Sequence, residues 1–161
     1  MPNEISLEEL KKEYASLEKK YKLPDFEAMN KEFQIERANE HETDFLLREV
    51  RKIVAEKIFG YLRMVEALLN PSNAQMFVFS MVKAMGTKER KSLEEVYKEL
   101  AKGEVEVIKL DLEYSEKDEA EFIKKSFSTW NKTKKEILQV VEAVEKNWKN
   151  KSEGKTRGYF G

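Results

Sequence analysis

Two arginines, Arg48 and Arg51, lie three residues apart in a stretch whose apolar spacing is that of a helix. Guanidinium groups at this spacing share one helix face, where two of them can clamp a carboxylate or a phosphate. Together with Arg63 they would bind a small anion in a helical-bundle enzyme, with Glu49 or another buried carboxylate as the acid–base group. The alternative, which we favour, is pairing with acids of the same chain such as Asp44.

Metal and nucleophile chemistry is restricted by the composition, because the chain has one histidine and no cysteine. Disulfides, thiolate metal sites, cysteine nucleophiles and sites with two imidazoles from one chain are therefore excluded. His41 stands among Glu40, Glu42 and Asp44 and could share a metal with them, but a solvated histidine is the expected outcome. The acidic run that begins at Asp111 lacks the glycine that an EF-hand loop has at its sixth place. No phosphate-binding glycine loop occurs. We predict no catalytic residue, no metal and no cofactor.

Aromatic and basic residues alternate near the end of the chain, around Trp130 and Trp148. Interleaved rings and lysines are typical of nucleic-acid surfaces, where bases stack on rings and lysines contact phosphates. Residues 130–157 would then associate with nucleic acid or a ribonucleoprotein. Both tryptophans also fit the apolar stripe of a helix, so core packing explains them equally well, and the sequence pI of about 6.1 is not that of a basic domain.

Residues 149–161 have the composition of a flexible basic tail, rich in Lys, Gly, Ser and Asn. An aromatic pair on such a tail is typical of a segment that docks into a partner's pocket. The alternative is that the two rings fold back onto the rest of the protein. The predicted partner-binding residues are Trp148, Lys149, Lys151, Lys155, Arg157, Tyr159 and Phe160.

The composition indicates a helical protein. The 161 residues are 40% hydrophobic and 38% charged, with only 6 Gly and 3 Pro, which disfavours a turn-rich β fold. Residues 101–121 carry a net charge of −5 and residues 122–161 a net charge of +6. No secretory signal and no apolar run long enough for a membrane helix is apparent, so we expect a cytoplasmic location and no membrane partner. The excess of Lys and Glu is typical of heat-adapted proteins.

Apolar spacing predicts a series of helices. The first begins at Ser6, with Glu9 completing a capping box, and a short second one begins at Asp25. The third covers 45–69, where Gly60 indicates a close approach or a bend. A helix follows over 71–85, uncharged through Val82, with apolar residues on all sides and its cap at Asn70.

The second half of the chain leaves two alternatives open. A fifth helix begins at Thr87 or Ser92 and ends at Gly103. Apolar and polar residues alternate over 104–114, which is the pattern of a strand. A lone strand has no partner here, so we expect an extended connector or a helix. From Ser115 onward the pattern fits one long helix or two that meet near residue 131.

The resulting prediction is a single-domain, all-α bundle of five to seven helices over residues 1–148, followed by the tail 149–161. The third helix and the helix 71–85 would lie at its centre. We expect a non-enzymatic interaction or adaptor protein that uses the Met-rich apolar helix and the tail. Its partner would be another protein or a second copy of itself.

Overall fold

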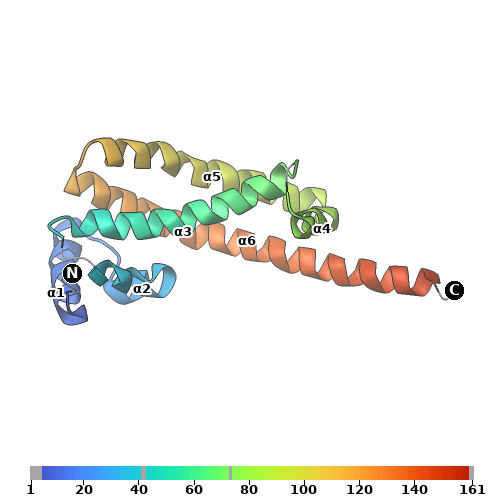
Figure 1. Cartoon of the computed structure of the whole chain (residues 1–161), viewed down its shortest axis with the longest axis horizontal. Helices are drawn as coiled ribbons and strands as arrows, with labels where there is room; N and C mark the ends of the chain where they lie inside the picture. The colour runs from blue at the N-terminus through green and yellow to red at the C-terminus, as the bar shows by residue number, and fades with distance from the viewer. Residues whose placement is uncertain (1–4, 41–42, 73, 160–161) are drawn as a thin grey trace. The chain divides into compact units, whose positions relative to one another are not determined.

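The computed structural model describes residues 5–40, 43–72 and 74–159, with side chains through Asn150. Every regular element in these ranges is a helix, so the predicted all-α bundle is confirmed (Figure 1). The elements are α1 (Leu7–Tyr21), α2 (Phe26–Phe33), the 3₁₀ helix η1 (Ile35–Glu40), α3 (Leu46–Leu69), α4 (Met76–Ala84), α5 (Thr87–Leu112) and α6 (Glu116–Tyr159).

The chain forms two compact units that share three of these helices. The first unit comprises residues Met1–Gly60 and Lys102–Trp130, and the second comprises Tyr61–Ala101 and Asn131–Gly161. The long helices α3, α5 and α6 each contribute one part to the first unit and one part to the second.

Local capping explains where the first helices begin and end. Ser6 and Glu9 form the predicted capping box, with each side chain accepting from the other residue's backbone N–H. Asp25 caps α2 by accepting from the N–H of Ala28 at 2.8 Å. Between the two helices, the hydroxyl of the fully buried Tyr14 donates to the carbonyl of Pro24 at 2.6 Å and fixes the turn.

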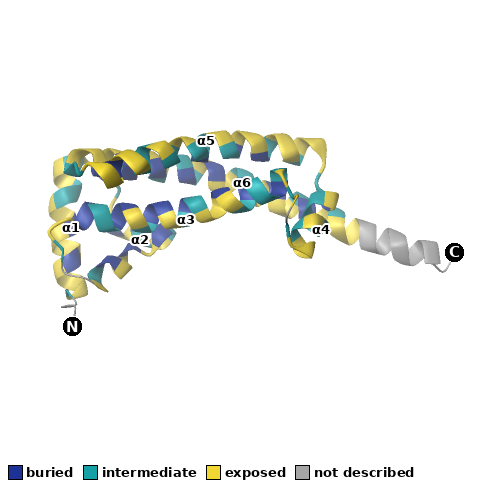
Figure 2. Ribbon diagram, turned by 45° about the horizontal axis from the view of Figure 1, so that its top comes forward, coloured by how far each residue is buried: buried dark blue, intermediate teal, exposed yellow. Residues whose placement is uncertain are grey.

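The core of the first unit includes Trp130 as well as aliphatic residues of α3 and α6. The indole Nε1 of Trp130 donates to Glu32 at 2.9 Å. The Lys57 ammonium lies 5.4 Å from the Trp130 ring centroid and 5.8 Å from that of Phe33. The ring is 2% exposed, so Trp130 is a packing residue and bases cannot stack on it in this structure. Figure 2 shows the buried faces of these helices in dark blue.

The second unit buries one face of each of its three long helical segments. Leu62, Val65 and Leu68 of α3 are buried, and α5 and α6 contribute the buried residues Leu93, Val96, Leu100, Val140 and Val144. The short helix α4 lies beside α6, where the Asn147 amide donates to the carbonyl of Ala84 at 3.1 Å (Figure 1).

The uncharged segment differs most from expectation. Helix α4 begins at Met76, whereas we expected a helix from Pro71; ahead of the helix, the Ala74 N–H donates to the Pro71 carbonyl at 3.1 Å. Gln75 precedes α4 without a side-chain cap. The expected central position is also wrong, since Ala84 is the one buried residue of α4.

The prediction at Gly103 is wrong as well, and of the two alternatives at Gly60 the close approach is wrong. Gly103 does not end the fifth helix, because α5 begins at Thr87 and continues to Leu112 through the segment that alternates like a strand. A Cβ at Gly103 would lie 3.5 Å from the Phe59 ring, which is an ordinary contact. Gly60 marks no close approach, since a Cβ there would meet nothing within 4 Å.

The last helical region is one helix. Helix α6 begins after the Ser115 cap, whose hydroxyl accepts from the N–H of Asp118 at 3.2 Å, and it passes residue 131 without a break. Thr133, the candidate for a new cap, is fully buried within it. The α6 backbone is helical to Tyr159, and side chains from Lys151 onward lie outside the described residues. The flexible tail therefore stays a prediction.

Candidate functional site

The α4 helix presents apolar side chains to solvent. Met76 is 85% exposed and Phe77 is 61% exposed, and Phe79 is also exposed. The helix carries a single charged residue, Lys83, near its end. Large aromatic rings and flexible thioethers are side chains that dominate protein–protein contacts.

A tryptophan from α6 extends this surface. The Trp148 ring is exposed, and its centroid lies 6.1 Å from that of Phe77 at an interplanar angle of 51°. Met76, Phe77, Phe79 and Trp148 together are called the α4 patch below. Asn147, next to Trp148, donates to the carbonyl of Ala84 at the end of α4, so α4 and α6 are held together beside the Phe77–Trp148 ring pair.

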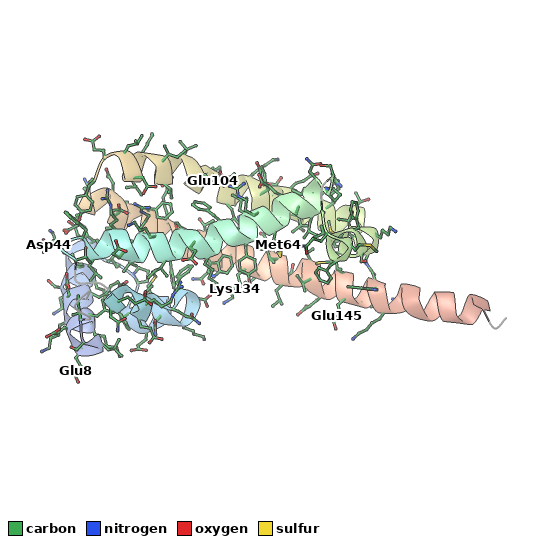
Figure 3. All side chains as sticks on the ribbon, viewed as in Figure 1. Glu8, Asp44, Met64, Glu104, Lys134 and Glu145 are labelled. Atoms are coloured by element: carbon green, nitrogen blue, oxygen red, sulfur yellow. The ribbon has the colours of Figure 1, made fainter. Side chains whose placement is uncertain are left out.

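Only part of the predicted partner-binding set lies in the described region. Trp148 belongs to the α4 patch, and Lys149 forms an exposed ion pair at 3.1 Å with Glu145, which Figure 3 labels on α6. The remaining residues of the set, Lys151, Lys155, Arg157, Tyr159 and Phe160, have side chains outside the described residues.

The predicted anion clamp on α3 already holds a carboxylate of this chain. Arg51 is 2% exposed and binds Glu119 in bidentate fashion, Nε to Oε2 at 2.7 Å and Nη2 to Oε1 at 3.2 Å. Its Nη2 also donates to Asp111 at 2.8 Å. Arg48 approaches the same carboxylate at 3.7 Å, donates to the carbonyl of Leu110, and lies 5.0 Å from the Tyr114 ring centroid.

These contacts stabilise the charged form of Arg51. Burial disfavours the charge on Arg51, but the hydrogen bonds and charges of Glu119 and Asp111 outweigh burial and raise the pKa of the guanidinium. The carboxylates that Arg51 binds come from α5 and α6, 60 and 68 positions along the chain, whereas we expected neighbours such as Asp44. No local sequence signal marks Glu119 as the partner.

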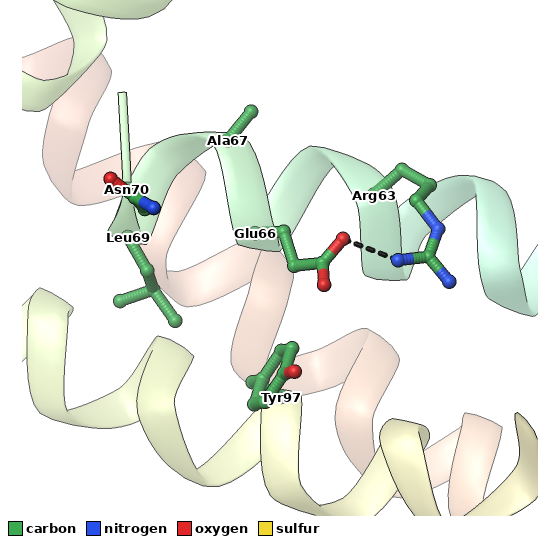
Figure 4. A pocket seen from close by; sticks show the side chains of 6 residues that line it. All are labelled: Arg63, Glu66, Ala67, Leu69, Asn70 and Tyr97. Atoms are coloured by element: carbon green, nitrogen blue, oxygen red, sulfur yellow. Dashed lines mark hydrogen bonds and ion pairs between the residues drawn. The ribbon is translucent and has the colours of Figure 1, made fainter. Parts of the chain in front are cut away.

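Arg63 belongs to the second unit and is not part of this cluster. It lines a cavity of about 520 Å³ with Glu66, Ala67, Leu69, Asn70 and Tyr97. Figure 4 shows Arg63 and Glu66 paired along one turn of α3, at 2.5 Å, with the Tyr97 ring below them on α5. The cavity is open to solvent, and its cation, Arg63, is paired with Glu66. It is therefore a weaker candidate for a binding site than the α4 patch.

The acidic side chains have structural partners at several positions. Glu116 accepts from the Tyr21 hydroxyl at 2.5 Å and from Lys20 at 2.9 Å, and these two hydrogen bonds lower the pKa of its carboxyl group.

His41 lies outside the described residues. Within the part of the chain that the structure describes, no three His, Cys, Asp or Glu side chains gather as metal ligands. No helix in that part is long and apolar enough to cross a bilayer.

The chain matches no family model, no curated protein and no solved structure. The class that the fold and the site define is an all-α helical bundle with an exposed aromatic surface on a short helix.

Proposed function

We propose that this chain is a non-enzymatic interaction protein of the adaptor type, which binds a protein partner through the α4 patch. One observation carries the proposal: the least charged helix of the described chain exposes Met76, Phe77 and Phe79 instead of burying them. Contiguous exposed apolar side chains on a soluble protein mark binding surfaces.

A partner that covers the α4 patch removes aromatic surface from water. A large aromatic side chain brings about 150–250 Å² of surface, so covering one half-exposed ring removes roughly 100 Å² from water. At about 25 cal/mol per Å², that contributes about 2.5 kcal/mol for each ring. The rings of Phe77 and Trp148 lie close enough for one partner surface to cover both.

The state of the arginine pair supports the same class of function. Arg51, the group best suited to hold an anionic substrate, makes its three hydrogen bonds to Glu119 and Asp111. A substrate anion would have to displace a fully buried carboxylate that is bound through two hydrogen bonds.

The test compares two serine variants of matched exposure as bait in extract from the source cells. Phe77→Ser alters the α4 patch, and Val105→Ser alters an apolar residue of α5 that is 59% exposed against 61% for Phe77. We expect a protein that the wild type and Val105→Ser both retain, that Phe77→Ser loses, and that survives nuclease treatment. The purified partner should then bind in the same order by calorimetry.

Two results would contradict the proposal. Equal recovery with Phe77→Ser and Val105→Ser would remove the α4 patch as the binding surface. Recovery that disappears with nuclease would instead support nucleic-acid association through residues 130–157, and a chain ending at Asn147 would then lose the same material.

A further inference from the structure

The part of α6 that belongs to the second unit exposes a row of four charged side chains. Glu142, Glu145, Lys146 and Lys149 are all exposed, and their spacing of three, one and three residues places them on one helix face. We call these four residues the charged row. Its two acidic residues come first along the helix and its two lysines follow, so one end is negative and the other positive while the net charge is zero.

Two exposed apolar side chains lie beside the charged row. Val141 precedes its acidic end, and Trp148 stands at its basic end. The two are seven residues apart, which is two turns, so they share one side of α6. The ring of Phe77 adjoins Trp148, with 6.1 Å between the centroids. An apolar side bordered by charged residues is the pattern of a helix that pairs with another helix.

We infer that this face of α6 binds the same face of a second copy of this chain, with the two helices antiparallel. A two-fold axis near Glu145 brings Val141 of each copy opposite Trp148 of the other. The same axis brings the acidic end of each charged row beside the lysines of the other copy. The apolar side chains and the charges are therefore matched in one arrangement.

The order of the signs selects the partner. A partner of uniform charge is repelled by one end of the charged row, and a parallel second copy would bring acid against acid and lysine against lysine. An antiparallel second copy presents both signs in the reverse order. Within one copy, Lys149 already pairs with Glu145 at 3.1 Å, but both side chains are exposed, and such a pair contributes little and can exchange for contacts with the second copy.

A two-fold contact uses the same surface on both copies, so association stops at the dimer. This inference goes beyond the proposed function, although Trp148 belongs to both surfaces. Val141 and the charged row lie outside the α4 patch, so they can be changed while all four residues of the α4 patch are kept.

The experiment measures the mass of the full-length chain by sedimentation velocity between about 1 μM and 1 mM. The wild type should rise from 19.0 kDa to twice that mass and no further. Lys146→Glu/Lys149→Glu makes the charged row wholly acidic, and Glu142→Lys/Glu145→Lys makes it wholly basic. Each double variant alone should associate about tenfold more weakly or less, because like charges meet. An equal mixture should dimerise at least as tightly as the wild type.

The matched control is Lys91→Glu/Lys98→Glu on α5, which replaces two exposed lysines of the same unit and changes the net charge by the same amount. It should dimerise as the wild type does, and far-UV circular dichroism checks that the helices of every variant persist. A second measurement needs no variant. Acrylamide quenching of the wild type should fall as the dimer forms, because the dimer covers Trp148, whereas Trp130 is already buried.

A wild type that stays monomeric or grows beyond a dimer overturns the inference. A mixture that associates no more tightly than the single variants overturns it too, as does a control that weakens as much as the acidic variant, or quenching that stays constant while the mass doubles. The two proposals fail separately. A monomeric wild type whose extract partner is lost in Phe77→Ser leaves the proposed function intact, and a dimer that follows the charge rule survives equal recovery with Phe77→Ser.

Discussion

Arg51, a candidate anion-binding residue by sequence, has a structural role in the folded chain. It lies buried against the fully buried Glu119, and each side chain neutralises the other. Removing one partner leaves the other as an unpaired buried charge, which costs far more than losing the pair as a whole.

Arg51→Met should therefore lower the free energy of unfolding by about 3–5 kcal/mol. Urea denaturation followed by circular dichroism measures this value. The double variant Arg51→Met/Glu119→Leu replaces the pair with apolar groups and should recover most of the loss. A single variant as stable as the wild type would show that Glu119 finds other partners, Arg48 first among them.

Glu116 makes stability depend on acid pH. Its pKa is lowered in the folded chain by hydrogen bonds from Tyr21 and Lys20, so its contribution is present above its ordinary pKa and is lost as the pH falls through the lower folded value. Tyr21→Phe removes the hydroxyl that contributes most. We expect the wild type to lose stability between about pH 5 and pH 3, and the variant to lose measurably less over the same range. Urea midpoints at a series of pH values test this; parallel curves would contradict it.

Residue-level prediction from sequence works where partners are neighbours in the chain. The Ser6–Glu9 box and the Asp25 cap involve residues three positions apart, so their types and spacing are sufficient. The carboxylates that bind Arg51 lie 60 and 68 positions away on other helices. Only the tertiary fold brings them together, and a single sequence contains no signal for that.

At the scale of elements, two glycines inside helices can be replaced by alanine to raise stability. A Cβ at Gly60 meets nothing within 4 Å, and one at Gly103 makes ordinary contacts with Phe59 and Phe122. Gly60→Ala and Gly103→Ala should each raise the free energy of unfolding by about 0.5–1 kcal/mol, because alanine loses less backbone entropy in a helix.

Gly86, which precedes α5, is the matched control for this pair. A Cβ there would lie 2.7 Å from the Glu89 carboxylate, which accepts from the Gly86 N–H, so Gly86→Ala should bring no gain. Thermal and urea unfolding of the three variants compare them directly. A loss of stability in Gly60→Ala would revive the close approach that the sequence suggested.

The spacing of apolar residues predicted which segments are helices better than it predicted which helices are buried. The stripes of α1, α2 and α3 specify both the helix and its buried face, since polar residues occupy the other side. In α4 the apolar residues surround the helix and define no face, so the same pattern fits a central helix and an exposed one. Packing decides between the two, and packing depends on α6, which lies far along the chain.

At the scale of the whole molecule, the two units should unfold together. Helices α3, α5 and α6 each continue from one unit into the other, so melting one unit removes helical turns on which the other depends. Trp130 reports on the first unit and Trp148 on the second. In Trp148→Phe and in Trp130→Phe, the remaining tryptophan's fluorescence should follow the same urea curve as the circular dichroism of that variant. Separate transitions would show two independent domains.

Met76 gives the α4 patch a chemical weakness that the core does not share. Met76 is 85% exposed, whereas Met29 is fully buried in the first unit. Peroxide oxidises accessible thioethers first and converts a flexible apolar side chain into a polar sulfoxide. Ageing or oxidative stress would therefore alter the surface of this protein before its fold, and a preparation that retains its full helicity could already carry a damaged α4 patch.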